Sequence, residues 1–140
     1  MMNKKIKKLK CAIIGIGHWG KNYIRVFNEI GNIEIKYICD KNSKLLKYYK
    51  NQYICINNIE KILNDKEIDF VVISTIASTH YELLKSFITN GKHVLVEKPI
   101  AISKREVSNL KKIKTNKVIF TGFTFLYNPA IIKIKNLINE

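Results

Sequence analysis

The ten residues Cys11–Gly20, with the sequence CAIIGIGHWG, limit the folds open to this chain more than any other stretch. An apolar run typical of a buried strand ends at a glycine, and glycines then occupy positions 1, 3 and 6 of G-x-G-x-x-G. Between a strand and a helix, the first glycine allows a tight turn, the second lets a pyrophosphate approach, and the third lets helix and strand pack closely. The helix offers phosphates its free N–H groups and the positive end of its dipole. The candidate cofactor-binding residues of this loop are Gly15, Ile16, Gly17, His18, Trp19 and Gly20.

A carboxylate follows the loop at the distance that a dinucleotide site requires. The second strand-like segment, residues 33–39, ends at Asp40, twenty residues after Gly20. A carboxylate there is placed to accept the ribose hydroxyls of NAD and to repel the 2′-phosphate of NADP. Lys41 comes next, and its cation could tolerate that phosphate. We therefore expect NAD, with NADP as the alternative; the competing interpretation is an ordinary αβ turn with an exposed Asp40.

Strand-like and helix-like segments alternate along the rest of the chain, which indicates an α/β fold with a parallel sheet. The expected strands are residues 11–14, 33–39, 53–56, 69–74, 93–97 and 118–125. The expected helices are residues 21–30, about 43–50, 59–64, 79–89, 103–114 and 128 onward. We predict a doubly wound, Rossmann-type sheet of about six strands with helices on both faces. Ligands of such sheets bind at the carboxyl ends of the strands, where the glycine loop, Asp40, Thr75 and the pair Glu97–Lys98 all fall.

The charge and hydropathy of the chain exclude several other classes of protein. A net charge of +14 in 140 residues is typical of proteins that bind nucleic acid. The lysines, however, are spread along helix-like segments outside a basic leader, residues 1–10, without the interleaved aromatic residues of single-strand binders. No stretch approaches the ~20 apolar residues of a membrane span, and the apolar run after the leader is too short for a signal peptide. We expect neither a nucleic-acid nor a membrane partner.

The cysteines and histidines suggest neither disulfides nor a metal site. The three cysteines form no C-x-x-C pair and are interpreted as reduced, buried residues of a cytoplasmic protein: Cys11, Cys39 and Cys55. No histidine has a second ligand at metal-binding spacing, so no metal is expected. His93 is expected to pack in its strand. His80 is counted among the cofactor-binding residues, with a role in orienting or supporting the site. Trp19 is expected to pack beneath the glycine loop, and His18 to lie near the phosphates.

The sequence Glu97-Lys98-Pro99, preceded by GKHVLV, resembles a signature of the Gfo/Idh/MocA oxidoreductases (glucose–fructose oxidoreductase, inositol dehydrogenase and relatives). Three further segments are similar to the N-terminal domain of this family: residues 15–22, 78–82 and 122–130. The sequences of residues 19–22 and 124–130 look most like those of the family branch that oxidises UDP-N-acetyl sugars and their uronates. The resemblance implies an NAD(P)-dependent enzyme that transfers hydride between nicotinamide and a secondary alcohol of a sugar, inositol or nucleotide sugar.

The resemblance also assigns roles to individual residues. It implies the three glycines at the pyrophosphate, Asp40 on the adenosine ribose and Thr75 near the cofactor. It places Glu97 and Lys98 beside the nicotinamide, with Lys98 as the catalytic residue that reaches the substrate hydroxyl, where an amine can polarise the forming carbonyl or join a proton relay. The Lys98–Pro99 bond is a candidate cis peptide that would aim this amine.

The chain is much shorter than members of the family it resembles. We expect a leader at residues 1–10, a dinucleotide-binding domain at 11–127, and at 128–140 the start of a crossing helix toward a substrate domain that this chain lacks. In the family that second domain carries the catalytic base. The chain would then need a separate companion domain or form a homo-oligomer, and the alternative function is a non-catalytic nucleotide-binding module or the remnant of a truncated gene.

Overall fold

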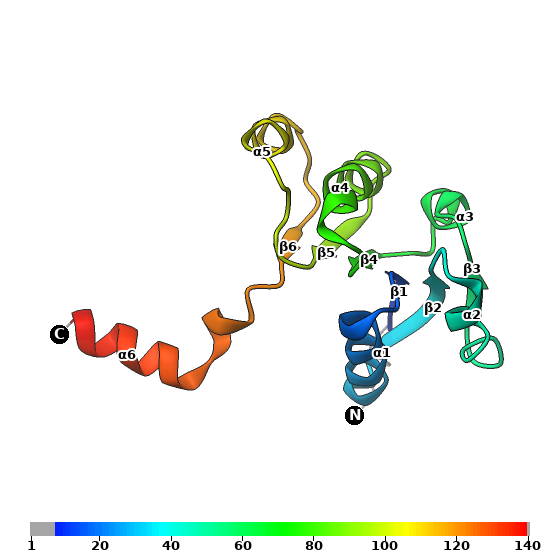
Figure 1. Ribbon diagram of the computed structural model, residues 1–140, viewed down its shortest axis with the longest axis horizontal. Helices are drawn as coiled ribbons and strands as arrows, with labels where there is room; N and C mark the ends of the chain where they lie inside the picture. Colours follow the sequence, from blue (N-terminus) through cyan, green and yellow to red (C-terminus); the bar gives the residue numbers. More distant parts are fainter. Residues whose placement is uncertain (1–7, 140) are drawn as a thin grey trace, which may run out of the picture.

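The computed structural model describes residues 8–139 and contains one six-stranded sheet in which every paired strand is parallel (Figure 1). The strands are β1 (Leu9–Ile14), β2 (Ile33–Cys39), β3 (Ile54–Ile56), β4 (Phe70–Ile73), β5 (His93–Val96) and β6 (Ile119–Thr121). Their order in the sheet is β3-β2-β1-β4-β5-β6. The chain thus winds outward in two directions from β1 and β4, which confirms the doubly wound fold. The switch point between these two strands is where sheets of this kind form their ligand crevice.

Helices cover both faces of the sheet, as the alternating pattern predicts. One face carries α1 (His18–Ile30) and α2 (Ser43–Leu46), and the other carries α3 (Glu60–Asn64), α4 (His80–Thr89) and α5 (Lys104–Lys111) (Figure 1). Each face has its own core: Ile24 and Phe27 of α1 pack with Ile13 and Val72, whereas Leu84 and Phe87 of α4 pack with Val71 and other side chains of the opposite cluster. Strands buried on both faces explain the continuous apolar runs of the sequence.

Several element boundaries differ from the sequence predictions. Helix α1 begins at His18 rather than Lys21 because Lys21 N–H already bonds to the carbonyl of Gly17. Helices α2 and α5 end earlier than expected. The expected strand 118–125 is wrong beyond Thr121, since the N–H groups of Phe123 and Thr124 bond two residues back and turn the chain out of the sheet. Helix α5 is capped by Ser103, whose Oγ accepts from Glu106 N–H at 3.2 Å.

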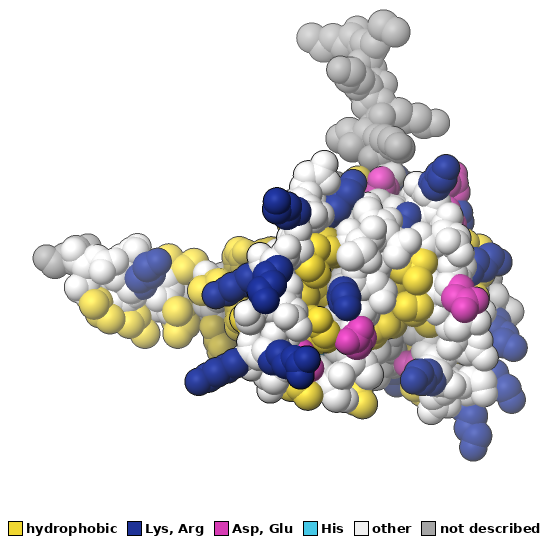
Figure 2. Space-filling view, turned by 90° about the horizontal axis from the view of Figure 1, so that it is seen from above, with side chains coloured by type: hydrophobic (Ala, Val, Ile, Leu, Met, Phe, Trp, Pro, Cys, Tyr) yellow, Lys and Arg dark blue, Asp and Glu magenta, His cyan; other side chains and the backbone are white. Residues whose placement is uncertain are grey.

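The chain leaves the sheet through η2 (Thr124–Tyr127) and α6 (Pro129–Asn139), which project from the rest of the molecule (Figure 1). Figure 2 shows Lys and Arg side chains scattered over the face of α3–α5 and hydrophobic side chains along α6. The large exposed apolar residues of this segment are Phe125, Leu126, Tyr127, Ile131, Ile132, Ile134, Leu137 and Ile138. Of the expected leader, residues 1–7 lie outside the described residues, and Leu9 and Lys10 already belong to β1.

All three cysteines are free thiols; Cys11 and Cys39 are buried as the sequence predicts, whereas Cys55 is not fully buried. Cys11 lies in β1 with no exposed surface, and burial together with the charge of Glu34 raises its pKa to about 12. Burial and the Asp40 charge raise the pKa of Cys39, in the adjacent β2, to about 11. Cys55 lies in β3, at the edge of the sheet, and is half-buried.

An ionic cluster stands apart from the carboxyl ends of the strands. Asp65, after α3, accepts hydrogen bonds at its Oδ2 from Lys36 Nζ at 2.6 Å and from Tyr37 OH at 2.8 Å. Lys36 also contacts Glu67 at 2.6 Å. Burial by itself would raise the pKa of Asp65, but the bonds from Lys36, the Glu67 backbone and Tyr37 outweigh it and lower the pKa to about 2. The cluster ties β2 to the segment that precedes β4.

Among residues 8–139, no helix is long and apolar enough to span a membrane. The same residues contain no group of three or more His, Cys, Asp or Glu side chains placed to hold a metal ion.

Candidate dinucleotide-binding site

The three glycines of the loop meet three different spatial requirements. Gly15 has φ +86°, and a Cβ there would lie 2.8 Å from the backbone of Ser74. A Cβ on Gly20 would lie 2.0 Å from the carbonyl oxygen of Gly15, so helix α1 can approach the turn only without a side chain there. A Cβ on Gly17 would meet nothing within 4 Å. The open space at Gly17 is what a site for a pyrophosphate requires, and the other two glycines shape the turn around it.

The start of α1 is suited to an anion. No side chain caps its first turn and no acidic residue lies there, so its first N–H groups and dipole face the space beside Gly17. His18 and Trp19 form an edge-to-face pair with ring centroids 5.7 Å apart. The prediction that Trp19 packs beneath the loop is wrong, because its side chain is 44% exposed. In the first turn of α1 it is Gly20 that packs against the glycine loop, and the neighbouring Trp19 faces solvent.

Hydrogen bonds from neighbouring strands fix the glycine loop. Gly15 N–H bonds to the carbonyl of Cys39 at 2.8 Å, and Ser74 Oγ donates to the carbonyl of Gly15 at 2.7 Å. Ser74 follows β4 directly and was not singled out by the sequence pattern. Its position at the end of an apolar strand, opposite the glycine turn, is the signal that could have identified it.

Asp40 lies beside the loop, at the end of β2, where the spacing predicts it. One carboxylate oxygen accepts from Ile16 N–H and the other from Asn42 N–H, both at 2.8 Å. The carboxylate therefore supports the loop as well as standing where it could bind a ribose. Ribose hydroxyls would share its oxygens with these backbone donors, since each oxygen has more than one lone pair.

The end of β4 and the end of β5 are joined by His80. Its ring is 1% exposed, with Nδ1 at 2.7 Å from the carbonyl of Pro99 and Nε2 at 3.0 Å from the carbonyl of Thr75. Thr75 Oγ1 lies 2.7 Å from Thr79 Oγ1. His80 thus supports both loops, and its contact with a cofactor stays a prediction. The Lys98–Pro99 peptide is cis, also as expected.

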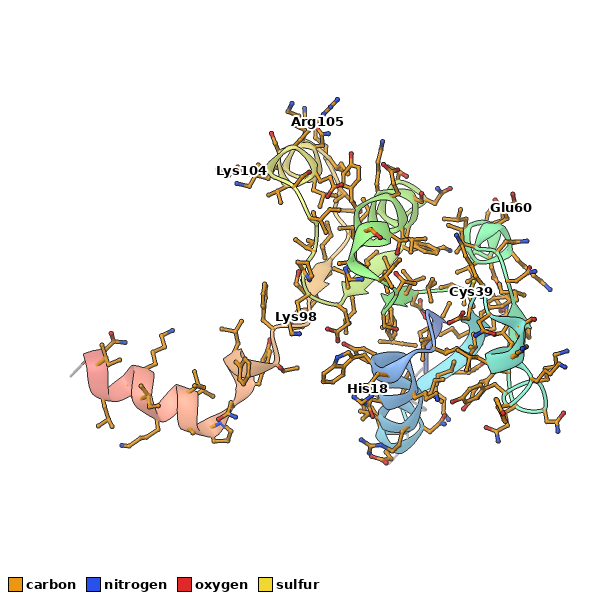
Figure 3. The ribbon with its side chains drawn as sticks, viewed as in Figure 1. His18, Cys39, Glu60, Lys98, Lys104 and Arg105 are labelled. Carbon is orange, nitrogen blue, oxygen red and sulfur yellow. The ribbon has the colours of Figure 1, made fainter. Side chains whose placement is uncertain are left out.

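Glu97 and Lys98 have opposite environments although they are neighbours. Glu97 is 6% exposed, and its Oε1 accepts a 2.6 Å hydrogen bond from Tyr23 OH of α1. Lys98 is exposed at the end of β5, on the side of the molecule where His18 lies, and far from Lys104 and Arg105 of α5 (Figure 3). Tyr23 is a residue that sequence reasoning missed, because nothing in its local pattern distinguishes it from other half-buried residues of α1.

The predicted residues therefore come together along one edge of the sheet. The glycine loop follows β1, Asp40 follows β2, Thr75 follows β4, and the pair Glu97–Lys98 follows β5. An anion-binding helix start lies at the centre, with a carboxylate on one side and an amine on the other. Such an arrangement can hold a dinucleotide across the crevice and present its far end to Lys98.

Comparison with known proteins agrees with this geometry. Residues 9–123 match the family model described as "Oxidoreductase family, NAD-binding Rossmann fold". The inositol 2-dehydrogenase of Salmonella paratyphi B is 24% identical over 140 residues, covering 94% of this chain and 42% of that protein. The scyllo-inositol 2-dehydrogenase (NAD(+)) of Bacillus subtilis is 30% identical over 142 residues, covering 94% of this chain and 40% of that protein. The chain spans about 40% of the length of the curated relatives it matches.

The fold is also shared with solved structures. The apo scyllo-inositol dehydrogenase of Lactobacillus casei superposes with a TM-score of 0.86 at 20% sequence identity, covering 96% of this chain and 42% of that one. The finer resemblance to enzymes of UDP-N-acetyl sugars stays a prediction. Because the family model matches residues 9–123, most of the chain, the chain belongs to the Gfo/Idh/MocA oxidoreductases through their NAD-binding Rossmann fold.

Proposed function

We propose that this chain binds NAD in the crevice between β1 and β4 and serves as the cofactor-binding part of a dehydrogenase. The observation that carries the proposal is the glycine loop, where Gly15 and Gly20 make room for the turn and Gly17 leaves open space at an uncapped helix start. Asp40 beside the loop supports NAD over NADP, and Lys41 leaves NADP as the alternative.

The proposed reaction is hydride transfer between the nicotinamide and a secondary alcohol of a sugar, inositol or nucleotide sugar. The cofactor, when bound, supplies the hydride chemistry. Lys98 is the proposed catalytic residue, since its exposed amine can donate to the oxygen that changes between hydroxyl and carbonyl. Glu97 beside it is buried and bonded to Tyr23, and is better placed to shape the site than to exchange protons with solvent.

The proposed function includes a second domain or a second copy of the chain, which would contact helix α6. Residues 128–140 include α6, whose apolar side chains are exposed along its length. Exposed apolar surface of this extent marks an interaction site, and we propose that it leads to and packs against a substrate domain or another copy of the chain. The free thiols support a cytoplasmic location. The alternative function, a nucleotide-binding module without turnover, is favoured if cofactor binds but no such companion exists.

Titration of the purified chain with NADH and NADPH tests cofactor binding directly. Trp19 is the only tryptophan and stands at the start of α1, so its fluorescence should report the ligand. We expect saturable quenching with tighter binding of NADH than of NADPH. A folded chain that responds to neither nucleotide would refute the proposal.

Substitution of Asp40 tests which part of the site selects the cofactor. Asp40→Ala should weaken NADH binding by about tenfold, the size of one lost charge-assisted interaction. Because Asp40 also holds Ile16 N–H, Asp40→Asn is the matched control: it keeps an acceptor oxygen for the loop but removes the charge. We expect the Asn variant to keep the fold and to lose the preference for NADH over NADPH. An unchanged preference in both variants would contradict the ribose assignment.

A further inference from the structure

A phenol–carboxylate pair, the half-buried Tyr23 and the buried Glu97, lies beneath the proposed nicotinamide end of the site. Tyr23 OH donates to Glu97 Oε1 at 2.6 Å, and Lys98 N–H bonds more weakly to Glu97 Oε2 at 3.3 Å. Burial and the neighbouring Glu97 carboxylate raise the pKa of Tyr23, so the phenol keeps its proton and acts as a donor. On a third side, the carboxylate packs against Gly122, where a Cβ would lie 3.2 Å from Oε1. The Glu97 carboxylate is thus held by contacts from helix α1, from its own loop after β5 and from the loop after β6.

The location of this pair relative to the cofactor follows from the sheet. Asp40, at the end of β2, marks the adenosine side of the crevice, and the glycine loop marks the pyrophosphate. The remaining half of the dinucleotide must extend the other way, across the ends of β4 and β5. Glu97 directly follows β5, so it lies at the edge of the sheet over which the nicotinamide half is proposed to extend.

The oxidised and reduced nicotinamide rings differ by one positive charge. A fixed negative charge near the ring therefore stabilises the oxidised form more than the reduced form, and it does so most strongly where the charge is shielded from water. Glu97 is 6% exposed, whereas Lys98, the next residue, is exposed and its ammonium is screened by solvent. The buried anion should dominate the field at the ring.

Resting on the proposed function, we propose that Tyr23 is a positioning residue that fixes the buried Glu97 carboxylate and thereby raises the affinity of the site for NAD⁺ relative to NADH. Without the Tyr23 hydroxyl, Glu97 Oε1 loses its donor and the carboxylate can turn away. The electrostatic field of Glu97 at the nicotinamide ring then becomes weaker. The contacts of NAD⁺ and NADH with the glycine loop and Asp40 are the same and remain.

The test is the ratio of the dissociation constants for NAD⁺ and NADH, measured by calorimetry on the purified chain. Glu97→Gln should raise the dissociation constant for NAD⁺ by roughly tenfold relative to that for NADH, as expected for one removed charge. Tyr23→Phe should change the ratio in the same direction by about threefold. Tyr53→Phe is the matched control, because it also removes a hydroxyl that bonds to α1, accepting from Asn28 at 2.7 Å, but at the opposite end of the strands; its ratio should be unchanged.

Gly122→Ala provides an independent route to the same result, since its methyl group would crowd the carboxylate while leaving Tyr23 and the charge intact. If Tyr23→Phe fails to fold, a changed ratio in Gly122→Ala still supports the proposal. Equal weakening of NAD⁺ and NADH in these variants would reveal a purely structural role and overturn it. Failure of the unsubstituted chain to bind either form would instead overturn the proposed function, and this inference with it.

Discussion

Gly20→Ala should destabilise the domain by about 3 kcal/mol and abolish binding of NADH. The added Cβ would lie 2.0 Å from the carbonyl oxygen of Gly15 and 2.9 Å from its carbonyl carbon. These are backbone atoms held by Ser74 and by the strand pairing, so the start of α1 must move away from the turn. Urea unfolding followed by circular dichroism would measure the stability, and Trp19 fluorescence the binding.

Gly17→Ala is the control for this prediction. Its Cβ would meet nothing within 4 Å, so the change in stability should be much smaller than for Gly20→Ala, about 1 kcal/mol or less. Affinity for NADH should still fall, because the methyl group would occupy the space proposed for the pyrophosphate. A Gly20→Ala variant as stable as Gly17→Ala would show that helix α1 does not pack on the turn as described.

Asp65→Asn should lower the free energy of unfolding by about 2 kcal/mol at pH 7, and this loss should disappear in acid. The folded pKa of Asp65 is about 2, against 3.8 for an ordinary aspartate. A depressed carboxyl pKa stabilises the folded state above the unfolded pKa, and this stabilisation is lost as the pH falls from about 4 to about 2. Urea titrations at several pH values should therefore show the two proteins converging over that interval.

Glu34→Gln is the matched control for the acid titration, because Glu34 is an exposed acid of the same strand as Lys36. Exposed charges contribute little to stability, so the pH dependence of this variant should follow that of the unsubstituted chain. If the stability of Asp65→Asn had the same pH dependence as that of the unsubstituted chain, the bonds from Lys36 and Tyr37 would not hold the Asp65 carboxylate in its charged form.

The sequence was sufficient for the parts of the site that depend on spacing along the chain. Once strands and helices alternate, all carboxyl ends of parallel strands meet at one edge, and the glycine loop, Asp40 and Lys98 must lie there together. The motif also predicts the close packing of Gly20, and a Cβ on Gly20 would indeed lie only 2.0 Å from the carbonyl oxygen of Gly15. These features are local in sequence and forced by topology.

The parts that sequence reasoning missed depend on the rotation of helices and on contacts between distant residues. Tyr23 and Glu97 are 74 residues apart, and their bond requires a particular face of α1 to turn toward the end of β5. The second role of Asp40, as an acceptor for Ile16 N–H, depends on a side-chain rotamer. Strand β6 ends early because the chain turns tightly after Thr121, and the local sequence does not predict these turns.

Because the cysteines differ in burial, the order in which they react with a thiol reagent should report which part of the sheet has unfolded. An alkylating reagent attacks only the thiolate, so Cys11, with a pKa near 12 and no exposed surface, is protected twice over. Cys55 at the edge strand should react first, during local fraying, and Cys11 only when β1 separates from its neighbours. The ratio of modified Cys55 to modified Cys11, measured by mass spectrometry, would distinguish fraying from complete unfolding without any substitution in the chain.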